Sequence, residues 1–338
     1  MKSLFVIFLI LSTSLIWKNS GDKIFSITWP EKTYDYSVNP RSDSKIQLGR
    51  ALFYDPILSK DNSISCSSCH LQATGFTHVD HDLSHGIDGR IGTRNSMALM
   101  NLAWSTSFMW DGGVPALDRQ TIAPITDHNE MDEDLKKVLK KLNKLPRYRK
   151  AFLEAFGAEE ATTQNLLFAI SQFELELISN NSKYDKYLRG EAQFNEQEQN
   201  GLQLFRNNCA SCHTEPLFTS HKFENNGLPL DPTLMDYGRK KITNLAEDAQ
   251  KFKVPTLRNI KHTYPYMHDG RFSKLREVLD HYTDNIERSS TLSPQFKKAI
   301  KLSSNEKADI IAFLFTLTDD DFLFNPKFGY PREFFSKE

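Results

Sequence analysis

Apolar residues recur at helical spacing in several parts of the chain. Residues 132–145 begin with an acidic turn and carry leucine and valine on one face, and the segment from about residue 305 repeats this amphipathic pattern. Residues 164–179 are apolar on most faces, which is typical of a helix buried in a core. Shorter helices are expected from about residues 46 and 116. No stretch alternates clearly enough to predict a strand, so the predicted fold class is mainly α.

Long polar segments with glycine and proline lie between these helices. Residues 71–95 contain four glycines and three histidines, and residues 214–253 form a second such segment. Loops of this length inside a compact domain are either functional or disordered. Residues 21–44 are polar and contain proline, which indicates an arm without a core of its own. We therefore expect a helical protein whose long loops contribute to a functional site.

Two Cys-x-x-Cys-His motifs use all four cysteines of the chain. This spacing is the attachment pattern of c-type haem: the two thiols bond the two vinyl groups of the porphyrin, and the histidine ligates the iron. A zinc site would gather four ligands in one local module, and a thioredoxin-like redox pair needs no histidine directly after it. The sequence therefore predicts two covalently bound haem c groups. The residues that would hold them are Cys66, Cys69, His70, Cys209, Cys212 and His213.

A short pattern, Gly-x-x-Leu-Phe, precedes each haem motif, at residues 49–53 and 201–205. The repeat suggests that one cytochrome c-like unit was duplicated. We expect two cytochrome c-like haem domains with long loops, an N-terminal one at residues 21–185 and a C-terminal one at residues 186–338. The boundary is expected near residues 183–195.

Charge and the N-terminal residues bear on partners and location. The formal net charge is −1 over 338 residues, so nothing suggests binding to nucleic acid. Residues 1–20 contain a lysine followed by an apolar run that is short for a membrane span, which is typical of a secretory signal peptide. Its small-residue cleavage site is poor, so an uncleaved N-terminal anchor stays open. Because c-type haem is attached outside the cytoplasmic membrane, we expect the protein in the periplasm.

Further motifs resemble the bacterial dihaem cytochrome c peroxidases and their relative MauG, and they occur in the family's order between about residues 46 and 318. They include Leu48-Gly49-Arg50, Arg94-Asn95, Trp110-Asp111-Gly112, Pro255-Thr256-Leu257-Arg258-Asn259 and Pro265-Tyr266-Met267-His268. The resemblance implies an enzyme that reduces hydrogen peroxide with electrons from a small redox protein, a cytochrome c or a cupredoxin. It also implies that the haem of His70 is the peroxidatic one and that the haem of His213 relays electrons.

The resemblance gives three residues catalytic roles. Trp110 matches the tryptophan that lies between the two haems, where an aromatic ring can bridge electron transfer. Glu130 matches the family's distal glutamate, which would move the peroxide proton as a general acid–base. Gln120 matches a neighbouring residue of the same pocket. Without the resemblance, Trp110 would be interpreted as a core residue and Glu130 as a surface residue.

The remaining iron ligands stay open. His85 falls where some of these peroxidases carry a histidine that blocks the first iron, but the loop after it is more similar to MauG-like members with an open site. His78 and His81 could also serve. For the second iron, Tyr282 matches the family's ligand position, where the peroxidases have methionine and MauG has tyrosine. Met267 is the alternative ligand, and Tyr282 could also be a packed aromatic residue.

The resemblance also implies one calcium ion between the domains, bound by the side-chain oxygen of Asn95 and the backbone carbonyls of Thr263 and Pro265. Two other functions stay open. A MauG-like oxidase acting on a protein or small molecule is favoured by Tyr282. A non-catalytic dihaem electron-transfer cytochrome would need both irons permanently six-coordinate, which would leave Glu130 without a role. A homodimer is a further open alternative.

Overall fold

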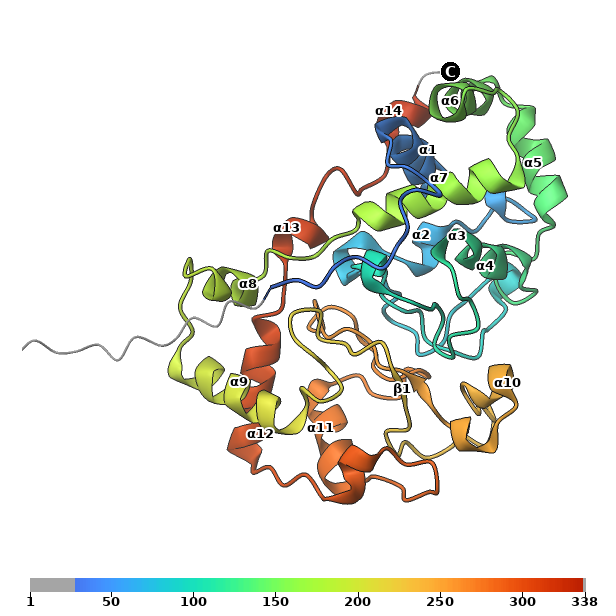
Figure 1. The fold of residues 1–338 in the computed structure, drawn as a ribbon. Helices are drawn as coiled ribbons and strands as arrows, with labels where there is room; N and C mark the ends of the chain where they lie inside the picture. Colours follow the sequence, from blue (N-terminus) through green and yellow to red (C-terminus); the bar gives the residue numbers. More distant parts are fainter. Residues whose placement is uncertain (1–27, 337–338) are drawn as a thin grey trace, which may run out of the picture.

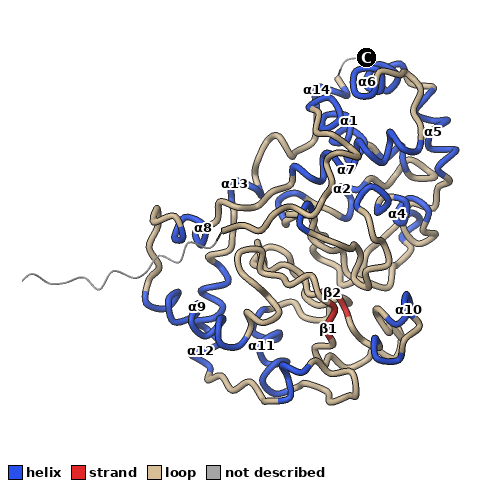
Figure 2. Tube along the Cα trace, in the orientation of Figure 1, coloured by secondary structure: helices blue, strands red, loops and turns tan. Residues whose placement is uncertain are grey.

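The structure is a computed structural model, and it describes residues 28–336. Two mainly helical units lie one above the other in Figure 1, and loops make up most of the chain where they meet (Figure 2). Within the described residues the paired strands are only β1 (Phe223–Glu224) and β2 (Phe252–Lys253), which are antiparallel. The predicted mainly α class with long loops is therefore confirmed. The leader or anchor expected in residues 1–20 lies outside the described residues.

The first unit is built on the contact between α1 (Asp43–Tyr54) and α7 (Thr163–Glu176). A Cβ atom at Gly49 of α1 would lie 1.8 Å from the carbonyl oxygen of Ala169 in α7, so only glycine lets the helices approach this closely. The other elements of this unit are α2 (Cys66–Cys69), α3 (Leu117–Gln120), α4 (Ile122–Thr126), α5 (Leu135–Asn143), α6 (Pro146–Phe156) and 3-10 turns at Pro56–Leu58, Gln72–Thr74, Ile87–Gly89 and Leu102–Trp104.

The second unit repeats this arrangement with α9 (Glu196–Asn208) and α12 (Ser304–Phe315). A Cβ atom at Gly201 of α9 would lie 2.0 Å from the carbonyl oxygen of Asp309 in α12. Gly49 and Gly201 are the glycines of the two Gly-x-x-Leu-Phe patterns, so the short sequence repeat has a packing reason. The other elements here are α8 (Lys183–Leu188), α10 (Lys240–Thr243), α11 (Leu275–Asp284) and 3-10 turns at Ala246–Asp248 and Pro294–Lys297.

Two helices are shorter than their apolar patterns predict. Helix α5 begins at Leu135 rather than near residue 132, because the Asp134 carboxylate accepts a hydrogen bond from the Lys136 backbone N–H (2.8 Å) and caps the helix. Helix α7 ends at Glu176 rather than at residue 179, since Leu177 leaves the helical conformation (φ −73°, ψ 70°). Among residues 28–336, no helix is both long and apolar enough to cross a membrane.

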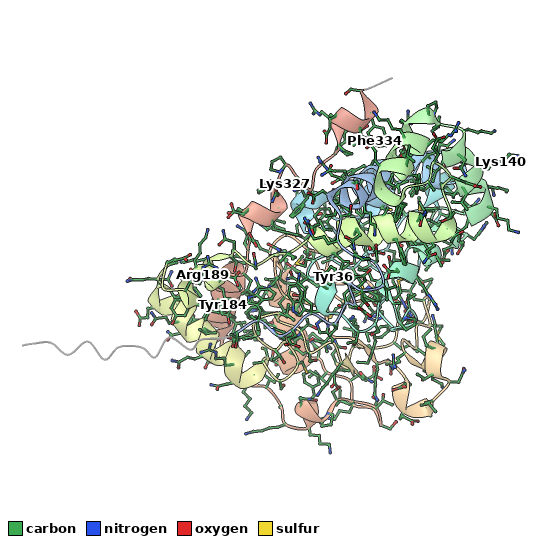
Figure 3. All side chains as sticks on the ribbon, turned by 45° about the horizontal axis from the view of Figure 1, so that its top comes forward. Tyr36, Lys140, Tyr184, Arg189, Lys327 and Phe334 are labelled. Carbon is green, nitrogen blue, oxygen red and sulfur yellow. The ribbon has the colours of Figure 1, made fainter. Side chains whose placement is uncertain are left out.

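The C-terminal segment, residues 319–336, returns from the second unit to the first (Figure 1). It contains α13 (Asp320–Leu323) and α14 (Arg332–Phe335). Phe322 of α13 packs in the first unit's core, 5.7 Å from the ring centroid of Phe76. The side chain of Phe334, labelled in Figure 3, packs against a second core cluster of that unit.

Hydrogen bonds hold the same segment against α1. The buried guanidinium of Arg50 donates to the carbonyl oxygens of Gly329 (2.6 Å) and Pro326 (3.0 Å). The Tyr54 hydroxyl donates to the carbonyl oxygen of Phe328 (2.8 Å). Residues 186–338 were predicted to form the C-terminal domain, whereas residues 319–336 contact the N-terminal unit.

A buried ion pair ties α8 to the segment that follows the second haem motif. The Arg258 side chain is fully buried and donates two hydrogen bonds of 2.8 Å to the Asp185 carboxylate, which is 4% exposed. A third bond runs from Arg258 Nε to the carbonyl oxygen of Pro216 (2.9 Å). The arginine of the Pro-Thr-Leu-Arg-Asn motif therefore has a structural task in the second unit.

Replacing Asp185 by asparagine should destabilise the protein by about 3–5 kcal/mol, because the Arg258 guanidinium would stay buried without its counter-charge. The free energy of unfolding is measured on the haem-loaded protein by denaturant titration. The control is Glu191→Gln, which removes an exposed ion-pair partner of Arg189 and should leave the midpoint unchanged. Equal midpoints for Asp185→Asn and the unsubstituted protein would contradict a stabilising role for this pair.

Candidate functional site

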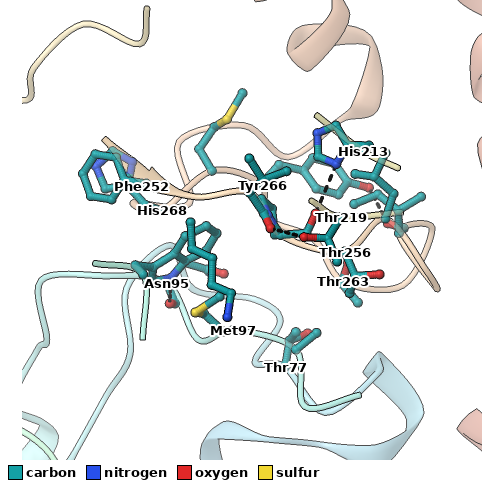
Figure 4. Close-up of a pocket in the computed structure, with 18 of the residues that line it drawn as sticks. Thr77, Asn95, Met97, His213, Thr219, Phe252, Thr256, Thr263, Tyr266 and His268 are labelled. Carbon is teal, nitrogen blue, oxygen red and sulfur yellow. Dashed lines mark hydrogen bonds between the residues drawn. The ribbon is translucent and has the colours of Figure 1, made fainter. Parts of the chain in front are cut away.

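A cavity of about 500 Å³ lies where the two units meet, and both Cys-x-x-Cys-His motifs line it. The first motif contributes Cys69 and His70, and the second contributes Cys209, Cys212 and His213. The rest of the wall is mainly apolar, and Figure 4 shows part of it. A cavity with apolar walls that is lined by three of the four thiols suits flat apolar cofactors that bond to sulfur.

Both motif histidines are held in the same way. His70 Nδ1 lies 2.8 Å from the carbonyl oxygen of Phe76, and His213 Nδ1 lies 3.2 Å and 3.1 Å from the carbonyl oxygens of Phe218 and Pro255. Because a carbonyl oxygen can only accept, the proton sits on Nδ1, and Nε2 keeps its lone pair for a metal. Burial lowers the pKa of both histidines to about 4, so both rings are neutral near pH 7.

The carbonyl groups that hold the histidines come from equivalent positions. Phe76 and Phe218 both adopt the left-handed backbone conformation, with φ of 59° and 54°. A bulky residue rarely adopts this conformation, and its cost is offset only where the surroundings require it. The same strained backbone conformation therefore supports the motif histidine in both units.

The cysteines themselves are poor thiolates. Burial raises the pKa of the Cys69 thiol to about 11 and that of Cys209 to about 12, and it raises the pKa of Cys66 further. A catalytic redox pair needs the opposite shift. Residues 28–336 also contain no group of three or more His, Cys, Asp or Glu side chains arranged to hold a metal ion. These motifs therefore fit neither a thioredoxin-like redox pair nor a zinc site.

Trp110 is buried in the cavity wall and is held by both units. Its indole Nε1–H donates to the carbonyl oxygen of Asn95 (2.8 Å), and its own carbonyl accepts from the backbone N–H of Lys253 (2.7 Å). The Asn95 N–H in turn donates to the carbonyl oxygen of His268 (2.7 Å). Asn95 and His268 are labelled in Figure 4, and they belong to opposite units.

An ion-pair cluster fixes the segments on either side of this tryptophan. Arg94 donates to the Asp111 carboxylate (2.6 Å) and, with two nitrogens, to the Asp236 carboxylate (2.6 Å and 3.0 Å). Asp236 belongs to the second unit, and its side chain is 1% exposed. Nothing in the sequence marked Asp236, since it lies in the long loop 214–253 without a motif.

Glu130 and Gln120 both line the cavity. Burial raises the pKa of the Glu130 carboxyl to about 7, and the nearby Asp127 carboxylate adds to the shift. The Gln120 amide lies 3.6 Å from the sulfur of Met109. A Cβ atom at Gly86 would lie 2.0 Å from the carbonyl oxygen of Asn129, so glycine there lets the preceding loop close over the Glu130 segment. Glu130 is a partly buried carboxyl of the cavity wall that can exchange a proton near neutral pH.

The three loop histidines gather away from the cavity wall. The rings of His81 and His85 stack with centroids 4.3 Å apart, and His78 lies 5.0 Å from His81. The His85 carbonyl oxygen is 3.4 Å from the Cys69 sulfur, but Ser84 is the residue of this segment that lines the cavity. Within the described residues, the structure therefore does not bring His78, His81 or His85 to the site.

Tyr282 and Met267 lie at one corner of the cavity. The side-chain nitrogen of Asn226 is 3.4 Å from the Tyr282 hydroxyl and 3.5 Å from the Met267 sulfur. Burial raises the pKa of the Tyr282 hydroxyl to about 12, and its ring stacks on Phe296 with centroids 5.5 Å apart. Both candidates for the second iron are thus brought to the same place.

The residues expected to bind calcium are all in the cavity wall. Asn95, Thr263 and Pro265 line the cavity, and Asn95 and Thr263 are labelled in Figure 4. The Asn95 amide nitrogen donates to the carbonyl oxygen of Asp82 (3.0 Å), which leaves its side-chain oxygen available. An amide oxygen and backbone carbonyl oxygens are ligands that calcium accepts.

Both haem attachment motifs line one cavity, and the histidine of each motif is neutral with its Nε2 available for iron. Together these features define a dihaem c-type cytochrome. The family model for di-haem cytochrome c peroxidase matches residues 43–193, and the cytochrome c model matches residues 198–318.

Similar proteins support the same class. The chain is 34% identical to the methylamine utilization protein MauG of Methylorubrum extorquens over 85% of this chain and 82% of that protein. It is also 34% identical to the cytochrome c551 peroxidase of Nitrosomonas europaea, over 87% and 85% of the two chains. A solved structure of a MauG-like protein associated with microbial copper homeostasis superposes with a TM-score of 0.83 and 32% identity, covering 94% of this chain and 99% of that one.

The chain belongs to the dihaem cytochrome c peroxidase family, which includes MauG. It carries two covalently bound haem c groups, as predicted from the two motifs. The thiols and histidines of the two motifs are the predicted attachment groups.

Replacing Cys209 and Cys212 together by alanine should leave one covalent haem, because the first motif attaches its haem independently. The intact mass of the acid-denatured variant should fall by one haem relative to the unsubstituted protein. Ser211→Ala, in the middle of the same motif, is the control and should keep both groups. A double variant that still carries two covalent haems would contradict the assignment.

Proposed function

We propose that the protein is a periplasmic peroxidase that reduces hydrogen peroxide to water with electrons from a small redox protein, a cytochrome c or a cupredoxin. The observation that carries the proposal is Glu130, a partly buried carboxyl with a pKa near 7 in the wall of the cavity that His70 also lines. The names of several relatives, including cytochrome c551 peroxidase, support the same activity.

The reaction consumes one peroxide, two electrons and two protons and yields two water molecules. A bound haem supplies the redox-active iron at which peroxide is reduced. Glu130 accepts the proton of the nearer peroxide oxygen and returns it to the leaving oxygen, and a pKa near 7 suits both steps. The Gln120 amide helps to orient the peroxide within the same wall, and the apolar residues around it exclude competing water.

The two electrons come one at a time from the donor protein, and a haem held by Cys209, Cys212 and His213 would relay them. Trp110 is the bridging residue of the proposal, because its ring is buried at the contact between the units and its backbone and indole are hydrogen-bonded to both sides. The rigid Arg94 cluster keeps this bridge at a fixed position, which suits repeated one-electron transfer.

Three further assignments belong to the proposal. Tyr282 is the sixth ligand of the second iron, with Met267 as the alternative in the same corner. One calcium ion is held by Asn95, Thr263 and Pro265 at the contact between the units. His85 does not ligate the first iron, because its ring stacks on His81 instead of lining the cavity. Whether two copies of the chain associate is a separate question.

A MauG-like oxidase is the second candidate. It would use the oxidising power of peroxide on a protein or small molecule instead of on a small redox donor. Tyr282 favours it, since a phenolate ligand stabilises ferric iron and makes oxidised states of the haem pair easier to reach. The similarity to MauG of Methylorubrum extorquens also supports the oxidase.

In the unsubstituted protein, the rate constant for reaction with peroxide should rise with pH through about 7 and then level off. The carboxylate form of Glu130 is the one that accepts the peroxide proton, and it predominates above its pKa. Glu130→Gln should lower this rate constant by about 10²–10⁴-fold and remove the inflection. Stopped-flow absorption of the haem bands gives both quantities.

The control for Glu130→Gln is Glu154→Gln, an exposed carboxylate on α6 that should change neither the rate nor its pH profile. Steady-state oxidation of a reduced cytochrome c by peroxide tests the activity itself. Rapid reaction with peroxide but no turnover with any cytochrome c or cupredoxin would exclude the peroxidase and favour the oxidase.

Tyr282→Phe should raise the reduction potential of the second haem and change its optical and EPR spectra, because the phenolate ligand would be lost. Met267→Leu is the matched variant, and it should leave the spectra unchanged if Tyr282 is the ligand. The reverse pattern would assign ligation to Met267. Unchanged spectra in both variants would exclude either ligand.

A further inference from the structure

The cavity wall contains two cationic side chains, and only one of them has a carboxylate partner. Arg94 is neutralised by Asp111 and Asp236. Lys253 is 6% exposed, and its ammonium nitrogen donates to the carbonyl oxygen of Ser107. It also lies 5.6 Å from the ring centroid of Phe108. Among residues 28–336, no carboxylate lies within ion-pair distance of it.

His221 also has a polar atom that lacks a hydrogen-bond partner among the described residues. It lines the same cavity, and its Nε2 atom is buried without a hydrogen-bond partner in the described part of the chain. Its Nδ1 lies 3.5 Å from the Ser105 hydroxyl, which can donate to it. In the tautomer in which Ser105 donates, the ring proton is on Nε2, which is then a buried donor without an acceptor among residues 28–336.

Backbone pairing brings these two groups together. Residue 253 lies in β2 beside β1, and the backbone N–H of Val254 donates to the carbonyl oxygen of Lys222 (2.8 Å). The Thr219 hydroxyl bonds the Val254 carbonyl oxygen (2.6 Å) and accepts from the His221 N–H (3.0 Å). Because the charge of Lys253 acts on His221 and adds to the effect of burial, the pKa of His221 falls to about 4 and the ring stays neutral.

A buried ammonium with free N–H groups and a buried imidazole N–H are both donors that need an anionic acceptor. A haem brings such acceptors into the cavity, since its two propionate carboxylates take no part in the bonds to cysteine. We propose that Lys253 and His221 together bind a haem propionate carboxylate.

The second haem is the expected source of this carboxylate. Both residues lie on the segment that follows the second motif, and the Pro255 carbonyl oxygen, two residues after Lys253, contacts His213 Nδ1 at 3.1 Å. The site also touches the bridging residue, because the Lys253 N–H donates to the Trp110 carbonyl oxygen. Lys253 and His221 thus connect the edge of the electron-relay haem with the tryptophan that the proposed function uses.

The test uses the haem-loaded full chain with Lys253→Met, Lys253→Arg and His221→Phe, and it requires no turnover. Resonance Raman spectra report the propionate bending band of each haem, and potentiometric titration gives both reduction potentials. Lys253→Met should shift the band of the second haem and lower its potential, because a nearby positive charge favours the reduced iron. Lys253→Arg should restore the potential, and His221→Phe should shift the same band.

Lys222→Met is the matched control, since this exposed neighbour uses only its backbone in the pairing described above. If only the first haem's band shifts, the two residues bind a propionate carboxylate, but it belongs to the first haem. That result would overturn the assignment to the second haem. Unchanged bands and potentials in both Lys253→Met and His221→Phe would overturn the proposal.

A crystal structure of the unsubstituted, haem-loaded protein covers the case in which the variants fail to take up haem. It should place a propionate oxygen within hydrogen-bond distance of Lys253 Nζ, and its absence there would equally overturn the proposal. These outcomes are separate from peroxidase turnover, so failure of the proposed function would not affect them.

Discussion

The whole site depends on the contact between each motif histidine and a backbone carbonyl. This contact fixes the proton on Nδ1, and burial then keeps the ring neutral, so that Nε2 is a metal ligand before any metal arrives. The carbonyl groups are supplied by residues in the long loops, with Phe76 and Phe218 held in the same left-handed conformation. These carbonyl groups follow the motif histidines by six and five residues, so only the first part of each long loop is used to hold the histidine.

The contact between the units also helps to position the groups of the site. Trp110 is bonded to Asn95 on one side and to Lys253 on the other, while Arg94 joins carboxylates from both units. The buried ion-pair cluster beside Trp110 therefore limits how far the two units can move relative to each other at the shared cavity. Each unit also has a hydrophobic cluster of its own.

Local spacing made much of the site predictable from sequence. The haem-holding residues are predicted from two five-residue motifs. The Gly-x-x-Leu-Phe repeat suggested a duplicated unit, and the structure has matching helix contacts at its glycines, Gly49 and Gly201. The place of Glu130 in the site was expected only through the family resemblance, because nothing within its own segment distinguishes it from a surface carboxylate.

Other parts of the site could not be predicted, because they are made by tertiary contacts. Asp236, His221 and Lys253 come from a loop and a short strand without periodicity, and their importance appears only when the second unit meets the first. Tyr282 and Met267 are separated in sequence, yet Asn226 contacts both, so counting from a motif could not decide between them. The stacking of His85 on His81 was equally invisible in the sequence.

The return of residues 319–336 makes the first unit discontinuous in sequence. The second unit can be cut out as one continuous piece that ends near residue 318, where the cytochrome c match also ends. The first unit cannot, because Phe322 belongs to its aromatic core and most hydrogen-bond acceptors of the buried Arg50 lie within residues 326–333. During synthesis most of the first unit is therefore made early, but these contacts form only after residues 319–336 have been added.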